Sequence, residues 1–128
     1  MINDVIHRFE ADRKRIYRAG MSVGARVALG IAIISNLIAG VIASNAGYPD
    51  SKPRKTVPFV LFGTAGPEDF NYLEMRQPDR TLTTPHRVAV VEGGHVWLSS
   101  ALAIEVVERM EIQAMKSGRK PRDPAWIV

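Results

Sequence analysis

The hydrophobic pattern of this chain is dominated by one long segment without charge. From Val27 to Pro49 no residue is charged, and every other uncharged stretch in the 128 residues is much shorter. A helix over residues 27–47 would be about 31 Å long, close to the roughly 30 Å of a hydrocarbon core. A core helix of a small domain is usually shorter and has a polar face. The pattern therefore predicts a transmembrane helix over residues 27–47.

Small residues recur at every fourth position before and along this segment, interrupted only by one asparagine. A stripe of small residues lets a second helix approach closely, and a mid-membrane amide can hydrogen-bond across the contact. We therefore predict a helix-packing interface with other membrane-protein subunits or with a second copy of the chain, while Ile34 and Ile38 face lipid. The alternative is that small residues are simply common in membrane spans. The predicted interface residues are Gly20, Gly24, Ala28, Ala32, Asn36, Gly40 and Ser44.

The segments on either side of the apolar run predict smaller elements. Apolar residues at helical spacing predict that residues 1–26 contain a basic amphipathic segment, lying on anionic lipid headgroups or a partner, or simply solvated. Prolines indicate a tether over residues 48–56. Beyond the tether, the sequences "TVPFVLFG" and "FNYLEM" each predict a strand, the first at an edge or with Pro58 at its start.

The clearest local pattern in the second half of the chain is a pair of β-rich runs around Gly93-Gly94, which predicts a hairpin. A helix is expected to follow, capped by Ser99 or Ser100 and ended by Gly118. The predicted fold is thus a single transmembrane α-helix plus a small α+β domain over residues 57–118, built of β-hairpins followed by one helix. Residues 119–128 form a basic and apolar tail.

Both faces of the predicted hairpin are apolar, and the domain is near the lower size limit for a core of its own. We therefore expect contacts with partner proteins. The candidate contact residues are Val88, Val90, Trp97, Trp126 and Ile127.

The net charge of +4 is unevenly distributed. Six basic residues precede the apolar run, and Lys52, Arg54 and Lys55 follow it closely. The positive-inside rule then places the N-terminus in the cytoplasm and the C-terminal domain in the periplasm, across a bacterial inner membrane. With the basic tail outside the cytoplasm, nucleic acid is not an expected partner.

Residues that could carry chemistry are sparse. The chain has no cysteine, which excludes disulfides and thiolate catalysis. His86 and His95 would lie about 20 Å apart in the predicted hairpin, too far to share a metal ion. Ser99-Ser100 lacks a nucleophile-elbow context, and Gly93-Gly94 is too short for a phosphate loop. We therefore expect no enzyme activity, no metal and no cofactor.

A short segment after the apolar run resembles a known family. Its residues are Lys55, Thr56, Val57, Pro58, Phe59 and Val60. Together with the basic N-terminal segment and the span, residues 8–75 resemble the bitopic inner-membrane subunits of type IV secretion and conjugation systems. The resemblance implies a structural, assembly role. The 79 residues after Pro49 are too few for that family's periplasmic domain, so the C-terminal fold is not implied.

Two other functions stay open at this point. One is an accessory subunit of an energy-transducing membrane complex, respiratory or photosynthetic. The other is a signal-anchored extracytoplasmic enzyme, which no set of residues in the sequence supports.

Overall fold

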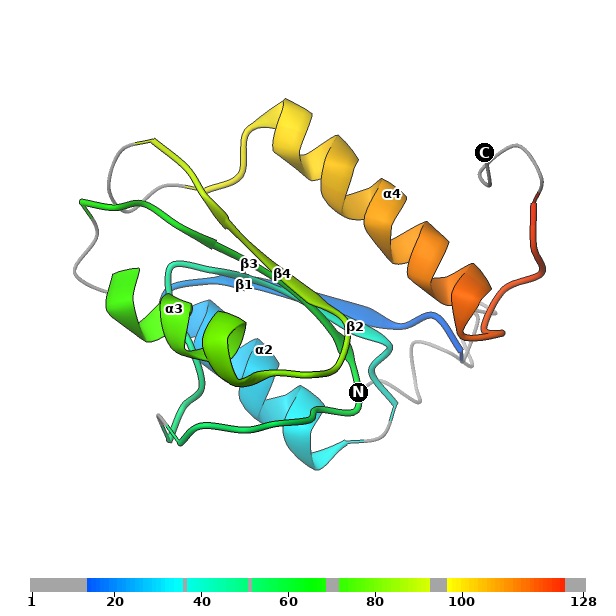
Figure 1. Ribbon diagram of the computed structural model, residues 1–128, viewed down its shortest axis with the longest axis horizontal. Helices are drawn as coiled ribbons and strands as arrows, with labels where there is room; N and C mark the ends of the chain where they lie inside the picture. Colours follow the sequence, from blue (N-terminus) through cyan, green and yellow to red (C-terminus); the bar gives the residue numbers. More distant parts are fainter. Residues whose placement is uncertain (1–13, 36, 51, 69–71, 93–96, 124–128) are drawn as a thin grey trace.

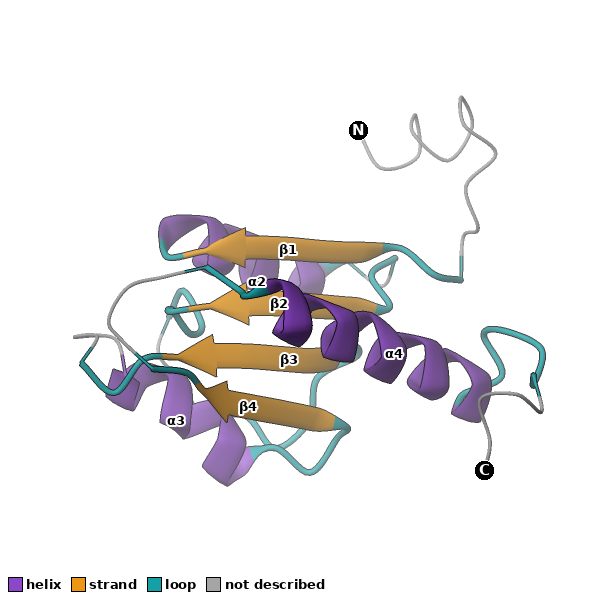
Figure 2. Ribbon diagram, turned by 90° about the horizontal axis from the view of Figure 1, so that it is seen from above, coloured by secondary structure: helices purple, strands orange, loops and turns teal. Residues whose placement is uncertain are grey.

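The computed structural model describes residues 14–35, 37–50, 52–68, 72–92 and 97–123. In these residues four strands form one sheet in the order β1-β2-β3-β4, and every neighbouring pair is parallel. All four strands therefore end at the same edge (Figure 2). The strands are β1 Tyr17–Met21, β2 Gly40–Ser44, β3 Val60–Ala65 and β4 His86–Val90.

Helices cover both faces of this sheet. Helices α2 (Val23–Ile34) and α3 (Tyr72–Thr81) lie on one face, and α4 (Ser100–Lys116) lies on the other (Figure 1). Right-handed crossovers between parallel strands place α2 and α3 on the same side. Helix α2 packs on the sheet through small residues, which allow a close approach. Its buried residues are Ala25, Ala28, Leu29 and Ala32.

The uncharged run forms two elements rather than one helix. Helix α2 ends at Ile34, and the chain continues as strand β2. Since β2 lies between β1 and β3 and is covered on both faces, it reads as a continuous apolar segment, as interior parallel strands do. Among the described residues no helix combines the length and the apolar character needed to cross a membrane. The predicted transmembrane helix is wrong, and with it the inner-membrane topology.

The predicted helix-packing stripe is also wrong as a single face. Gly20 lies in β1, while Gly24, Ala28 and Ala32 lie in α2. Gly40 and Ser44 are in β2, and Asn36 lies outside the described residues. The fourfold spacing therefore arises from one helix face and two separate strands, and not from one continuous helix.

Other sequence predictions had mixed outcomes. The strand in "TVPFVLFG" is confirmed as β3, with Pro58 before its start, but it is an interior strand. The "FNYLEM" segment leads into helix α3, so the strand predicted there is wrong. The hairpin around Gly93-Gly94 is wrong as well, because residues 97–99 form no strand and α4 begins at Ser100. Of the N-terminal segment, residues 1–13 lie outside the described residues, and residues 17–21 form β1.

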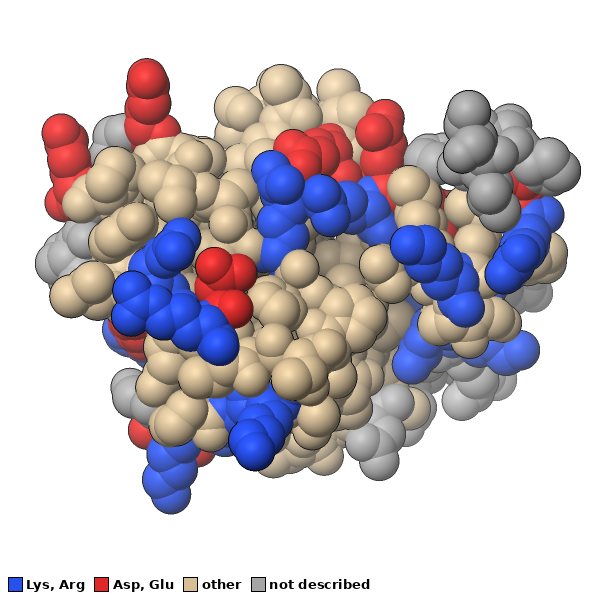
Figure 3. All heavy atoms as spheres, in the orientation of Figure 1, with Lys and Arg blue, Asp and Glu red and all other residues tan. Residues whose placement is uncertain are grey.

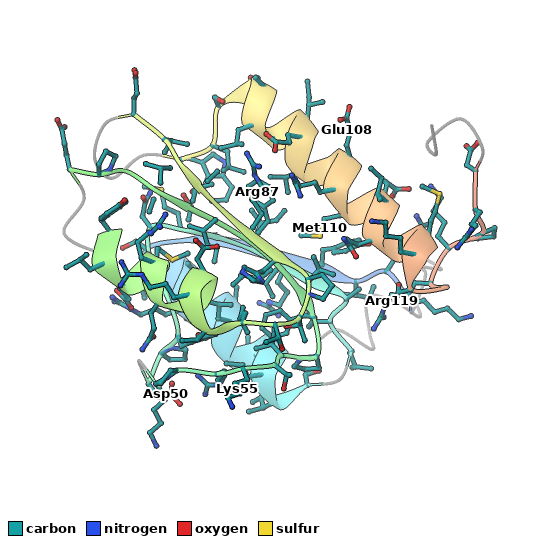
Figure 4. All side chains as sticks on the ribbon, in the orientation of Figure 1. Asp50, Lys55, Arg87, Glu108, Met110 and Arg119 are labelled. Atoms are coloured by element: carbon teal, nitrogen blue, oxygen red, sulfur yellow. The ribbon has the colours of Figure 1, made fainter. Side chains whose placement is uncertain are left out.

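Helix α4 is confirmed close to its expected bounds. The Ser99 hydroxyl accepts a hydrogen bond from the Leu102 amide, and Gly118 follows the helix with a positive φ of 78°. Met110 points from α4 toward the sheet (Figure 4), where a Cβ on Gly40 would lie 2.8 Å from its sulfur. Basic and acidic side chains are interspersed on the face in Figure 3, and Arg87 and Arg109 both contact Glu105.

Two isoleucines that a membrane helix would present alike are expected to differ in this fold. Ile34 is 85% exposed and Ile38 is 1% exposed. Ile38→Ala should lower the free energy of unfolding by about 2–5 kcal/mol, because it leaves a cavity in the core. Ile34→Ala should change it by about 0.5 kcal/mol or less. Guanidinium denaturation followed by circular dichroism measures both, and equal costs would contradict the fold.

Candidate active site

The carboxyl edge of the sheet holds two residues with unusual backbone conformations. Ser22 follows β1 with φ 57° and ψ −120°, and Asn45 follows β2 with φ 59°. Among the described residues these are the two non-glycine residues with positive φ. Ligands bind outside the carboxyl ends of the strands in open α/β sheets, and strained backbone concentrates at functional sites. This edge is therefore the candidate site.

Backbone hydrogen bonds hold both strained residues against the neighbouring strand. The amide of Ser22 donates to the carbonyl of Ser44 at 2.8 Å, and the amide of Asn45 donates to the carbonyl of Thr64 at 2.8 Å. Beneath them, the hydroxyls of Ser44 and Thr64 lie 2.7 Å apart, and the Asn45 Nδ2 donates to the Ser44 Oγ at 3.2 Å. All three side chains are buried. The strand ends under Ser22 are thus joined by a polar network.

The turn at Ser22 is tight enough to require glycine. Residues 20–24 read Gly-Met-Ser-Val-Gly, the G-x-S-x-G spacing of a nucleophile elbow between a strand and a helix. A Cβ on Gly20 would lie 2.3 Å from the carbonyl carbon and oxygen of Gly24. A Cβ on Gly24 would meet open space. The strand and the helix therefore approach each other only because residue 20 has no side chain.

The hydroxyl of Ser22 is not used to cap its helix. Serine at the start of a helix commonly accepts a hydrogen bond from the first turn, but Ser22 makes no such bond. The residue is partly exposed, and Val23 and Gly24 after it are exposed. The first amide groups of a helix lack intrahelical partners and mark its positive end. A hydroxyl beside such donors can act as a nucleophile whose oxyanion intermediate is stabilised by the amides.

Acidic and histidine residues follow the neighbouring strands in the sequence. Glu68 comes three residues after the end of β3 and is exposed, with Asp69 next in the chain. His95 comes five residues after the end of β4. Asp69 and His95 lie outside the described residues. The order Ser22, Glu68 or Asp69, His95 is the chain order of the triad that accompanies a nucleophile elbow.

The other candidate features are a histidine and a cavity at the opposite edge of the sheet, and a metal site. His86 begins β4 at the opposite edge, with its Nδ1 2.7 Å from the carbonyl of Thr84. A cavity of about 260 Å³ also lies at that amino edge, lined by Tyr17, Phe59 and Met110 among others. No histidine, aspartate or glutamate is among the described residues that line this cavity, so it pairs no hydroxyl with such a base. Among the described residues, no three side chains of His, Asp or Glu gather as a metal site.

The sequence-predicted contact residues are dispersed. Val88 is partly buried in β4, while Val90 and Trp97 are 48% and 47% exposed. Trp126 and Ile127 lie outside the described residues. The partner contacts thus stay predictions. The sequence prediction does not include Ser22, because it places Gly20 and Gly24 in a helix-packing stripe, although the sequence has the G-x-S-x-G spacing.

Solved structures with a similar fold are α/β hydrolases. A Bacillus cereus carboxylesterase has a TM-score of 0.60 and 16% identity, covering 86% of this chain and 55% of its own. For a Pyrococcus horikoshii acylaminoacyl peptidase the TM-score is 0.57 and the identity 13%, with 90% of this chain and 26% of the peptidase covered. An Agrobacterium tumefaciens protein of unknown function, described as an α/β hydrolase, has a TM-score of 0.55 and 14% identity, with coverages of 95% and 61%.

These likenesses establish the fold: this chain has a parallel α/β arrangement similar to part of an α/β hydrolase. It spans less than two thirds of the length of each of these proteins. No family model and no curated protein matches the chain, and nothing in the comparisons indicates a type IV secretion subunit. The expected membrane span with a hairpin domain, the membrane assembly role and the absence of enzyme activity are contradicted by this fold.

The two glycines of the turn are expected to respond differently to alanine. Gly20→Ala forces a Cβ into the backbone of Gly24 and should cost about 1–3 kcal/mol or more of unfolding free energy. Gly24→Ala places its Cβ in open space within a helix and should be neutral or stabilising by up to about 1 kcal/mol. Guanidinium denaturation measures the free energy of unfolding of both variants. A harmless Gly20→Ala would show that the strand and helix do not approach as described.

Proposed function

We propose that this chain is a serine hydrolase that cleaves esters by acyl transfer through Ser22. The observation that carries the proposal is the strained backbone of Ser22 in a strand–turn–helix, with a hydroxyl that does not cap the helix. Such strain is retained where it positions a reacting group. The likeness to α/β hydrolases supports the same reading, since the elbow lies at the carboxyl edge of a parallel sheet.

The reaction has two half-reactions. The Ser22 oxygen attacks the ester carbonyl carbon while His95 takes the hydroxyl proton. The tetrahedral intermediate collapses, the carbon–oxygen bond to the alcohol breaks, and the alcohol leaves with that proton. Water then attacks the acyl-enzyme, His95 takes a proton from it, and the acid leaves as the Ser22 hydroxyl is restored. The amide of Val23, which follows the nucleophile, is the assigned oxyanion donor.

The assignment of His95 and of an acidic residue rests on their order in the chain. All strands of the sheet are parallel, so the segments after β1, β3 and β4 leave from the same edge. His95 follows β4, and Glu68 and Asp69 follow β3. In a triad the carboxylate orients the imidazole and stabilises its protonated form. Either of the two acidic residues fits that role by position.

Hydrolysis of p-nitrophenyl butyrate tests the nucleophile. Ser22→Ala removes the attacking oxygen and should lower kcat about 1,000-fold or more. Ser100→Ala is the matched control, because Ser100 is exposed at the start of α4 and should retain wild-type kcat. Equal kcat values for the wild type and Ser22→Ala would contradict the proposal.

The same assay separates the two candidate acids. His95→Ala should abolish turnover as Ser22→Ala does, because the nucleophile loses its base. Of Asp69→Asn and Glu68→Gln, one should lower kcat about 10⁴-fold, since a neutral partner no longer holds the imidazole tautomer. The other should behave as the wild type. Full activity in all three variants would show that Ser22 works without this triad.

A further inference from the structure

A bidentate ion pair joins the helix after Ser22 to the helix after the acidic loop. Arg26 lies in α2, four residues after Ser22, and Glu74 is the third residue of α3. The Arg26 Nε donates to Glu74 Oε1 at 3.2 Å, and Nη2 donates to Oε2 at 2.8 Å. The carboxylate raises the pKa of the guanidinium above its ordinary value through this hydrogen bonding. Paired arginine–carboxylate bonds of this kind fix orientation as well as distance.

Helix α3 depends on such contacts for its position. Pro78 lies inside α3 and has no amide hydrogen, so the carbonyl of Glu74 loses its usual partner four residues on. The helix is anchored on the sheet by buried Met75, which occupies the space left by Gly63. A Cβ on Gly63 would lie 2.5 Å from the Met75 methyl carbon. A short helix with an internal proline thus takes its placement from tertiary contacts.

Glu74 also contacts the segment that follows β2. A Cβ on Gly47, in the segment after β2, would lie 3.1 Å from both the Cγ and the carbonyl oxygen of Glu74. The Glu74 side chain is 19% exposed and the Arg26 side chain 37% exposed. The carboxylate is therefore held between α2 and the β2–β3 connection. Movement of α3 relative to the elbow would have to break this arrangement.

We propose that Arg26 and Glu74 are positioning residues that fix the first turn of α3, the helix that follows the two acidic residues in the chain, relative to the Ser22 elbow. The inference rests on the proposed hydrolase function. Arg26 lies about one helical turn after Ser22, and Glu74 lies five residues after Asp69. The pair thus acts on both helices close to the ends that face the site. Catalytic groups lose about 100-fold in rate when displaced by about 1 Å, so a small shift of α3 has a measurable consequence.

A second bidentate arginine–carboxylate pair provides the matched control. Arg54 binds Asp50 through two bonds of 3.0 and 2.8 Å, but both residues belong to the connection between β2 and β3. Exposed ion pairs contribute about 0–1 kcal/mol to stability. If Arg26 and Glu74 were only a surface ion pair, their removal would therefore resemble the removal of Arg54 and Asp50. Positioning predicts a loss of kcat that the control pair does not show.

The test measures kcat and KM for p-nitrophenyl butyrate together with the guanidinium unfolding midpoint. Arg26→Gln and Glu74→Gln should each lower kcat about 10- to 100-fold and change KM less than about threefold, because alignment is lost rather than binding. The double variant Arg26→Glu/Glu74→Arg should recover most of the lost kcat. Arg54→Gln and Asp50→Asn should keep wild-type kcat. The unfolding midpoints of all four single variants should shift by similar, small amounts.

Each other outcome overturns the inference in a recognisable way. Wild-type kcat in Arg26→Gln and Glu74→Gln would show that the pair does not position the site. A loss of kcat that tracks the unfolding midpoint, without rescue by the exchanged pair, would show a purely structural role. A wild-type protein no more active than Ser22→Ala would overturn the hydrolase function, and the inference with it.

Discussion

The backbone at Ser22 is the constraint on which the rest of the site depends. An L-residue at φ 57° and ψ −120° is strained by about 1–3 kcal/mol, and surrounding contacts must hold it there. The bond from the Ser22 amide to Ser44 fixes the turn on β2. The buried face of α2 then fixes the helix that follows. Gly20 makes the geometry feasible, since any side chain there would strike the backbone of Gly24.

The strained turn at Ser22 also identifies the edge of the sheet that carries the candidate site. Because all four strands are parallel, their carboxyl ends and the segments after them lie along one edge. The strained turn, the buried Ser44–Thr64 hydrogen bond and the loop that begins at Gly66 all belong to that edge. The described lining of the cavity at the opposite edge contains no histidine, aspartate or glutamate. The Arg26–Glu74 pair connects the first turns of the two helices that follow the candidate nucleophile and the candidate acids in the chain.

The sequence predicted some elements well and others for the wrong reason. Helix α4 could be predicted because Ser99, Gly118 and the helical spacing between them are local signals. The apolar run misled because an interior parallel strand and the helix before it are both uncharged, so together they imitate one membrane helix. Nothing local separates Ile34 from Ile38, yet one is exposed and the other is buried by the sheet. The G-x-S-x-G spacing was readable, but its meaning depends on a strand before it and a helix after it.

The reactivity of Ser22 toward a fluorophosphonate tests the central claim most directly. An activated serine displaces fluoride and forms a stable phosphonyl ester, which mass spectrometry of a proteolytic digest locates to one residue. The account predicts one adduct per chain, on the peptide that contains Ser22, in the native protein and not in guanidinium. No adduct on the native protein, or adducts spread over other serines, would contradict it.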